Sequence, residues 1–292
     1  MTPAPSPGSK PAHPEVLRLD EITDKEHLAG AGNWLYKIPF RDGHAVLKGY
    51  FGNRNPLLHV KKTLGNVVLT GRTSHMPSAR CKHERECVGV WEEHGFRCFG
   101  IYPEVIFEDL PEGQYLLFDY VPGLHFKNYF ADDSVPVEDR LDTWRRWLPE
   151  WHRRHKAAVE NGEPRLIHEN GDVKHVMLWE NDFVYFDFEI CFRSSDVRDL
   201  VGRELLAYLR SVGKWFGDKM YDLMMDEVII HYPDKSLLME GWAHAFENHN
   251  VAMRYARRLD YALKAKNKKP YSKYSVALDL KRRLDAASLT NG

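Results

Sequence analysis

Polar residues that could carry out chemistry are concentrated in one stretch of the chain, residues 165–192. It reads RLIHENGDVKHVMLWENDFVYFDFEICF, in which two strand-like apolar runs flank a polar loop. The second run, FVYF, leads directly to an acidic group, Asp187. The loop before it contains imidazole, amide and carboxylate side chains: His168, Asn170, Asp172 and His175. Phosphoryl transfer needs a group near the acceptor hydroxyl and ligands for a magnesium ion, so this stretch is typical of a phosphotransferase site.

These residues resemble the catalytic motifs of the protein-kinase-like superfamily. In that family a loop of the form H-x-D-x-x-x-x-N precedes a strand that ends in Asp-Phe-Gly, and Asp187-Phe188-Glu189 resembles the second motif. Counted from His168, the metal-binding Asn of the family falls on His175, an exchange that is also seen in the lipopolysaccharide core kinases. The resemblance implies ATP and Mg²⁺ as cofactors, with Asp187 and His175 as the metal ligands.

The position of the catalytic carboxylate in this loop is open to two interpretations. When the motif is aligned on His168, the catalytic Asp of the family falls on Asn170. When it is aligned instead on the Gly-Asp pair, Asp172 is the base, and the loop is then two residues shorter than the motif before His175. An amide has no useful basicity at neutral pH, whereas a carboxylate can accept the hydroxyl proton. We therefore favour Asp172 as the base and keep Asn170 as the alternative, with His168 as a further catalytic-loop residue.

A nucleotide-binding region is expected upstream of this loop. Gly30 and Gly32 lie in a strand-rich region and would let the backbone approach a phosphate closely. The next strand, HAVLKGY, contains Lys48, and the resemblance implies that this lysine contacts the phosphates of the nucleotide. On the helix that follows, Glu84 has the spacing of the carboxylate that pairs with the lysine in the family, and Glu86 is the alternative.

The fold class that the resemblance implies is α+β, a bilobal protein-kinase-like fold. Its N-lobe would be an antiparallel sheet with one main helix, and its C-lobe would be mostly helical. FDYV resembles the hinge between the lobes, where Asp119 and Val121 would hold adenine through their backbone. The predicted parts are a flexible tail at 1–15, an N-lobe at 16–119, a C-lobe at 120–265 and a basic tail at 266–292.

Helical periodicity predicts how the C-lobe is built. An aromatic stripe at 3–4-residue spacing around Trp144, Trp147 and Trp151 predicts the buried face of a helix, which Pro149 is expected to bend or break. Further along, Asp199 begins another helix and is expected to brace the catalytic loop, as an Asp at this place does in the family.

Composition limits the function classes. The chain has 292 residues, 43% of them hydrophobic, and a formal net charge of −1, which fits a globular protein and argues against a bulk nucleic-acid binder. It has no run of 18 apolar residues and no apolar N-terminal segment, so we expect neither a membrane span nor a secretory signal, and a cytoplasmic location. A metal site at Cys81, His83 and Cys87 lacks a fourth ligand of matching spacing.

Two stretches without Asp or Glu, residues 43–83 and 261–278, predict basic surfaces that suit an anionic partner. Only a short segment separates Asp187 from the helix at Asp199, and no Ala-Pro-Glu follows, which disfavours a protein substrate. The sequence thus predicts an ATP-dependent kinase that phosphorylates a sugar hydroxyl of the lipopolysaccharide core, Kdo or heptose. Its partners would be ATP and an anionic sugar or glycolipid, with peripheral contact to the inner membrane as an option.

Two alternatives remain. One is a small-molecule kinase similar to the aminoglycoside and choline phosphotransferases, although those gather acidic groups around cationic acceptors. The other is a pseudokinase without catalysis, which is motivated by Asn170 at the catalytic register and by Glu189 in place of glycine.

Overall fold

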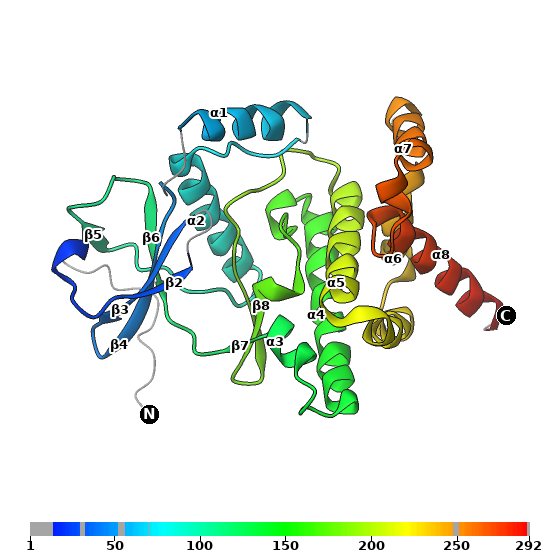
Figure 1. Ribbon diagram of the computed structural model, residues 1–292, viewed down its shortest axis with the longest axis horizontal. Helices are drawn as coiled ribbons and strands as arrows, with labels where there is room; N and C mark the ends of the chain where they lie inside the picture. The colour runs from blue at the N-terminus through cyan, green and yellow to red at the C-terminus, as the bar shows by residue number, and fades with distance from the viewer. Residues whose placement is uncertain (1–13, 30–32, 52–55, 70, 248–250, 291–292) are drawn as a thin grey trace.

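A computed structural model describes residues 14–29, 33–51, 56–69, 71–247 and 251–290. Figure 1 shows a sheet-rich lobe at one end and a helical lobe at the other, with the C-terminal helices farthest from the sheet. The expected α+β architecture, an antiparallel N-terminal sheet followed by a mostly helical C-lobe, is confirmed.

The N-lobe sheet has the order β2-β3-β4-β6 and is antiparallel throughout. In the central strand, Lys48 pairs with Leu35 on one side and Leu116 on the other. Residues on one face of β4, such as Ala45 and Leu47, are buried in a small apolar core, and alternation turns Lys48 to the opposite face, toward α2. The elements of this lobe are β1 (Glu15–Leu17), β2 (Glu26–Ala29), β3 (Trp34–Phe40), β4 (Gly43–Gly49), α1 (Pro56–Leu64), α2 (Pro77–Glu93), β5 (Val105–Phe107) and β6 (Tyr115–Asp119).

The C-lobe is built on α4 and the long α5, which pack against each other. A small sheet of order β7-β8-β9 carries the polar loop and Asp187. Helix α5 changes direction at Gly217, whose φ of 74° is the left-handed region that favours glycine. The elements are β7 (Leu124–His125), α3 (Phe126–Ala131), α4 (Val137–Asn161), β8 (Val176–Trp179), β9 (Asp182–Tyr185), α5 (Val197–His231), α6 (Lys235–Trp242), α7 (Val251–Leu263) and α8 (Lys273–Thr290).

The aromatic stripe of α4 is the centre of the C-lobe core. Trp144, Trp147 and Trp151 are fully buried, and the rings of the last two stack with centroids 4.6 Å apart. The prediction of a buried face is therefore confirmed. Pro149 does not break the helix as expected, because α4 is continuous from Val137 to Asn161.

A buried carboxylate, Glu204 of α5, joins α4, α5 and the polar loop. It accepts hydrogen bonds from the Trp151 indole at 3.0 Å and from the backbone N–H of His168 at 2.6 Å, and it pairs with Arg154. Burial alone would raise the pKa of Glu204, but the guanidinium of Arg154 outweighs this effect and holds that pKa well below its usual range. The loop is therefore anchored through an ionised group inside the core.

Asp199 does not brace the loop, contrary to the prediction from sequence. Its carboxylate instead lies 3.0 Å from Nδ1 of His244 and 3.4 Å from Arg257, on the side of α5 that faces the C-terminal helices. Glu204 lies five residues further along α5, which turns it toward α4 and the loop, so this residue performs the anchoring.

The segment expected to be a basic tail, 266–292, contains a helix. Residues 273–290 form α8, which packs against α5 and α6 and is part of the C-lobe. Tyr274, Leu280 and Leu284 are buried there. Within the residues that the structure describes, no helix is both long and apolar enough to cross a bilayer.

We predict that Glu204→Gln lowers the free energy of unfolding by about 3 kcal/mol, because it leaves Arg154 buried without its ion-pair partner. Urea unfolding followed by circular dichroism would measure the change. Glu138→Gln is the matched control: Glu138 also pairs with an arginine, Arg145, but is 72% exposed, and its loss should cost well below 1 kcal/mol. Equal and small losses for both variants would contradict an anchoring role for Glu204.

Candidate functional site

Lys48 lies between three carboxylates at the boundary of the lobes. Its Nζ is 2.7 and 3.0 Å from the two oxygens of Glu84, 3.2 Å from Oδ1 of Asp187 and 3.8 Å from Glu189. Burial would lower the pKa of Lys48, but the three carboxylates, Glu84 above all, raise it well above its usual range, so the lysine is charged. The structure thus brings together Lys48 and Glu84, whereas Glu86 lies on the outer side of α2 near Lys82 and His83.

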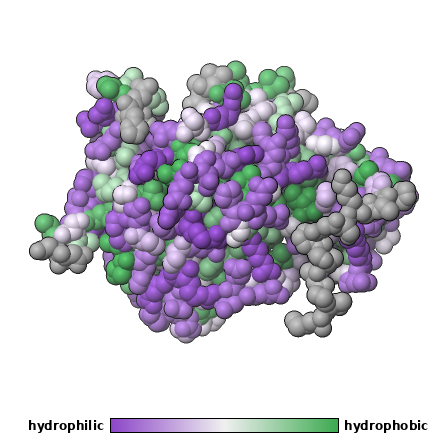
Figure 2. All heavy atoms as spheres, turned by 180° about the vertical axis from the view of Figure 1, so that it is seen from behind, coloured by the Kyte–Doolittle hydropathy of each residue, from purple (hydrophilic) through white to green (hydrophobic). Residues whose placement is uncertain are grey.

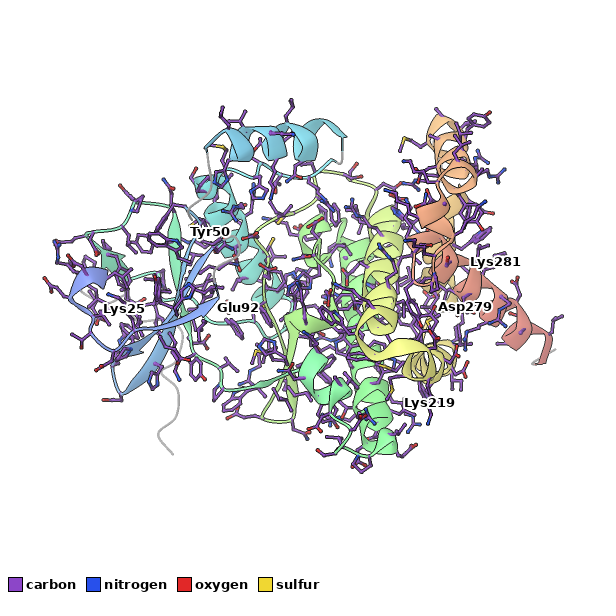
Figure 3. All side chains as sticks on the ribbon, in the orientation of Figure 1. Lys25, Tyr50, Glu92, Lys219, Asp279 and Lys281 are labelled. Atoms are coloured by element: carbon purple, nitrogen blue, oxygen red, sulfur yellow. The ribbon has the colours of Figure 1, made fainter. Side chains whose placement is uncertain are left out.

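Two neighbours of this cluster were not expected from sequence. The hydroxyl of Tyr50, which follows β4 and lies next to α2, donates to Glu84 at 2.5 Å (Figure 3). Arg80, one turn before Glu84 on α2, is buried and donates to Glu189 at 3.1 Å. With Lys48 and Arg80 against three carboxylates, the site has an excess of negative charge. Arg80 could have been noticed from its four-residue spacing to Glu84, which places both side chains on one face of the helix.

Asp187, His175 and Asn170 meet on the other side of Lys48. Asn170 donates through Nδ2 to Oδ2 of Asp187 at 2.7 Å, and Nε2 of His175 lies 3.3 Å from the same oxygen. Asp187 has φ of 74°, a left-handed conformation that costs energy for a residue with a side chain and is typical of functional sites. The structure therefore brings Asn170 and His175 to the same carboxylate oxygen of Asp187.

Hydrogen bonding fixes which nitrogen of His175 is available. Its Nδ1 lies 2.8 Å from the backbone oxygen of Asn170, which can only accept, so Nδ1 carries the proton. Burial lowers the pKa of His175, more than the nearby Asp187 raises it, so the ring is neutral. Its Nε2 lone pair then faces the Asp187 carboxylate, and two acceptors this close suit a shared cation.

These residues fit a magnesium ion that is held jointly with a nucleotide. Among the described residues, no three His, Cys, Asp or Glu side chains cluster closely enough to hold a metal ion by themselves. Mg²⁺ usually takes one or two protein ligands and completes its shell with phosphate oxygens and water. Asp187 would be the main ligand and His175 the second, softer one.

His168 and Asp172 have structural contacts in this loop. Nδ1 of His168 lies 2.8 Å from the hydroxyl of Tyr208, and burial lowers the pKa of His168 to about 3, so its ring is neutral. The carboxylate of Asp172 accepts from the backbone N–H of Lys174 at 3.0 Å and from the indole of Trp215 at 2.9 Å. Both of these contacts engage Oδ1 of Asp172. Of the two candidates for the catalytic position, Asn170 is the one that contacts the carboxylate of Asp187.

The predicted hinge lies at the end of β6. Asp119 pairs with Ala45 in the sheet, and its N–H donates to the oxygen of Gly100 at 2.9 Å, while the half-buried Val121 follows in an extended connection. One carboxylate oxygen of Asp119 is buried without a hydrogen-bond partner among the described residues. Gly30 and Gly32, the expected phosphate-binding glycines, lie outside the described residues.

The segment after Asp187 is short and tied to the N-lobe. Nine residues separate Asp187 from the first residue of α5. The N–H of Thr73 donates to the oxygen of Cys191 at 3.0 Å, and the N–H of Arg193 donates to the oxygen of Gly71 at 2.8 Å. The segment therefore pairs with residues 71–73 instead of forming a long open loop.

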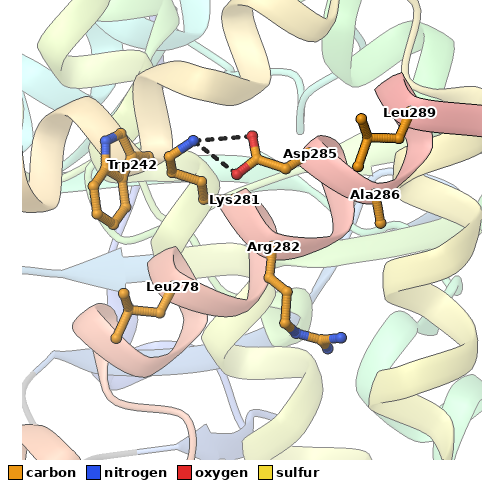
Figure 4. A pocket seen from close by; sticks show the side chains of 7 residues that line it. All are labelled: Trp242, Leu278, Lys281, Arg282, Asp285, Ala286 and Leu289. Carbon is orange, nitrogen blue, oxygen red and sulfur yellow. Dashed lines mark hydrogen bonds and ion pairs between the residues drawn. The ribbon is translucent and has the colours of Figure 1, made fainter. Parts of the chain in front are cut away.

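A pocket elsewhere on the surface contains none of these residues. Its volume is about 510 Å³, and Figure 4 shows that it is lined by α6 and α8. The lining residues are Trp242, Leu278, Lys281, Arg282, Asp285, Ala286 and Leu289. Its one acid, Asp285, is paired with Lys281 of the same helix, whereas three carboxylates converge on Lys48.

No family model and no curated protein matches the chain. Solved structures align with it at low identity. The Rio2 kinase from Chaetomium thermophilum, in an ADP/Mg²⁺-phosphoaspartate complex, is 12% identical over 91% of this chain and 73% of that chain, with a TM-score of 0.42. WaaP in complex with acyl carrier protein is 11% identical over 84% and 91%, with a TM-score of 0.41. The pseudokinase DRIK1 is 13% identical over 94% and 97%, with a TM-score of 0.42. At this level of similarity no residue of the chain takes its role from the aligned proteins.

We predict that Asp119→Asn stabilises the protein at pH 7.5 and not at pH 4. Burial raises the pKa of Asp119 to about 6, so the folded state binds a proton more tightly than the unfolded state. The cost of ionising this buried carboxylate is absent below the unfolded pKa and grows as the pH rises through about 6. Thermal unfolding across this range should show a gain of about 1–2 kcal/mol at the higher pH only, after allowance for partial burial.

The control for this prediction is Asp133→Asn, because Asp133 is fully exposed and its removal should leave the pH dependence unchanged. A gain from Asp119→Asn that is the same at both pH values would contradict the burial argument.

Proposed function

We propose that this protein is an ATP- and Mg²⁺-dependent phosphotransferase. The observation that carries this proposal is the convergence of Lys48, Glu84, Asp187 and His175 at the lobe boundary. In this proposal Lys48 binds the nucleotide phosphates, and Glu84, assisted by Tyr50, holds its amine in place. The metal, when bound, would neutralise charge on the transferred phosphoryl group. Backbone groups near Asp119 and Val121 would hold the adenine, with Gly30 and Gly32 next to the phosphates.

The acceptor that we propose is a sugar hydroxyl on an anionic glycolipid, of the lipopolysaccharide core (Kdo or heptose) type. The short segment between Asp187 and α5 supports a non-protein acceptor, because its backbone is paired with residues 71–73 and offers no long loop for a peptide. The structure leaves less unpaired positive charge in residues 43–83 than the sequence predicts. Within the acid-free stretch 43–83, several cations are neutralised by acids from elsewhere: Lys48, Arg72, Arg80 and Lys82. A small-molecule acceptor is therefore the alternative.

Asn170 is the residue next to the transferred group in this proposal. Its amide contacts Asp187, whereas Asp172, which we favoured from sequence, is hydrogen-bonded to Trp215. Phosphoryl transfer proceeds through a loose transition state in which positioning matters more than proton abstraction. Asn170 could thus orient the acceptor hydroxyl, at a rate below that of an enzyme with a carboxylate. A nucleotide-binding pseudokinase is the second candidate function, and the same amide is the observation that favours it.

We predict that Lys48→Ala abolishes ATP turnover while the fold is retained, since among the described residues Lys48 is the cation that pairs with both Glu84 and Asp187. ADP release with ATP and Mg²⁺, with and without core glycolipid, would measure turnover. Lys82→Ala is the control, because Lys82 lies on α2 but is 72% exposed. Unchanged turnover in Lys48→Ala would remove the phosphotransferase proposal.

We predict that Asn170→Asp raises turnover by about 100-fold or more, because it adds a general base where Asn170 now lies. Asp172→Asn should change turnover only a few-fold. The same ADP assay measures both variants. If Asp172→Asn is inactive and Asn170→Asp brings no gain, Asp172 is the base. If neither the parent nor Asn170→Asp turns over ATP although both bind it, the pseudokinase function holds.

A further inference from the structure

Helix α7 has its apolar face turned away from the protein. Val251, Tyr255, Leu259 and Leu263 follow one another at four-residue spacing and are 68%, 70%, 46% and 73% exposed. None of the residues of α7 is buried. Figure 1 shows the helix projecting from the end of the helical lobe. A surface helix of a globular protein normally turns such a stripe toward the core, so this orientation requires a reason outside the chain.

Polar contacts hold the opposite face of α7 against the C-lobe. Arg257 lies 3.4 Å from Asp199 and donates to the backbone oxygen of His244. The ring of Tyr261, one turn later, packs against Phe246 and Tyr274. Arg257 and Tyr261 are thus on the inner side, and the apolar stripe is fixed on the outer side by specific contacts.

Positive charge borders the apolar stripe. Residues 251–269 contain seven Lys or Arg and a single Asp, so the surface has a strong positive bias. The acid, Asp260, is already paired with Lys264 and accepts from Tyr274. Arg258 at the side of the stripe and Lys266, Lys268 and Lys269 just beyond the helix are exposed. Apolar residues flanked by exposed cations are typical of helices that lie in the surface of an anionic membrane.

Helix α1 repeats this pattern on the other lobe. Val60 and Leu64 are 58% and 64% exposed, with Lys61 beside them, and the inner side is held by the buried His59. Figure 1 shows α1 along the upper edge of the molecule, the same edge that α7 reaches. Figure 2, from behind, shows hydrophobic and hydrophilic side chains next to one another along that edge. In Figure 1, α1 runs along this edge whereas α7 stands upright against it, so the outward stripe of α7 is a surface separate from α1.

We propose that α7 and the lysines that follow it form a docking surface for an anionic lipid bilayer. The apolar side chains enter the interface between headgroups and acyl chains, and the lysines bind anionic headgroups. An acidic protein would pair with the lysines but would not cover an apolar stripe that lacks charges. A second copy of the chain would place its own positive charge against the same lysines. The bilayer is the occupant that matches both properties. This docking surface is independent of the proposed function, since it requires neither nucleotide nor acceptor.

Vesicle flotation with the full chain tests the docking surface. The protein should float with vesicles of phosphatidylcholine mixed with phosphatidylglycerol, at least tenfold more than with phosphatidylcholine alone, and less as salt rises. Leu259→Glu with Leu263→Glu should reduce binding at least tenfold at every salt concentration. Lys266→Glu with Lys268→Glu should reduce binding at low salt and flatten the salt dependence.

Ile230→Glu is the matched control, because Ile230 is an equally exposed apolar residue, 66%, on α5, and its change should leave flotation unaltered. All four positions changed in α7 and beyond it are exposed, so thermal unfolding should be the same for each variant and the parent. Absence of flotation with anionic vesicles would overturn the proposal, as would binding that the α7 substitutions leave unchanged. A dimer of the parent in light scattering that Leu259→Glu with Leu263→Glu dissociates, without flotation, would assign the stripe to a second copy.

Discussion

The C-lobe depends on the ion pair and the hydrogen bonds that the buried carboxylate of Glu204 makes. It is reached by an indole, a guanidinium and a backbone N–H that come from α4 and the polar loop. A buried ionised group is tolerated only where its partners satisfy all of its oxygen lone pairs. The tryptophan stripe of α4 supplies the apolar surroundings, and Glu204 makes the position of His168 relative to that core unique. Further along, the loop is also held by Ser211, which accepts from the N–H of Val173, and by Trp215, which donates to Asp172.

At the lobe boundary, in contrast, the charges do not balance. Glu84, Asp187 and Glu189 face Lys48 and Arg80, and the neutral His175 adds a lone pair without adding charge. A strained backbone conformation together with strongly shifted pKa values is typical of a functional site.

Much of this arrangement could be predicted from the sequence, where local patterns decide. The resemblance to the protein-kinase-like motifs and their order in the chain selected Lys48, Glu84 and Asp187, which lie together in the structure, and helical spacing was sufficient for the tryptophan core. The sequence was less informative wherever two elements must be placed relative to each other. Asp199 and Glu204 lie on one helix, and only the angle at which α5 packs on α4 decides which of them reaches the loop. The direction of the side chains within the loop could not be predicted for the same reason. Asp172, for example, is hydrogen-bonded to Trp215, which is distant in the sequence.

The pairing of residues 71–73 with residues 191–193 couples parts that are separate in the sequence. Residues 71–73 lie shortly before α2, and Cys191 follows Asp187 by four positions. A short ladder of two backbone hydrogen bonds, with a third bond from the N–H of Cys191 to the hydroxyl of Thr73, therefore links the segment before the helix that carries Glu84 to the segment after Asp187. Arg72 adds an ion pair to Glu169, next to His168. An outward swing of α2 would have to strain or break this ladder as well as the Lys48 contact. The two halves of the site thus form one mechanical unit, which favours a permanently assembled cleft over one that is switched by the rotation of a helix.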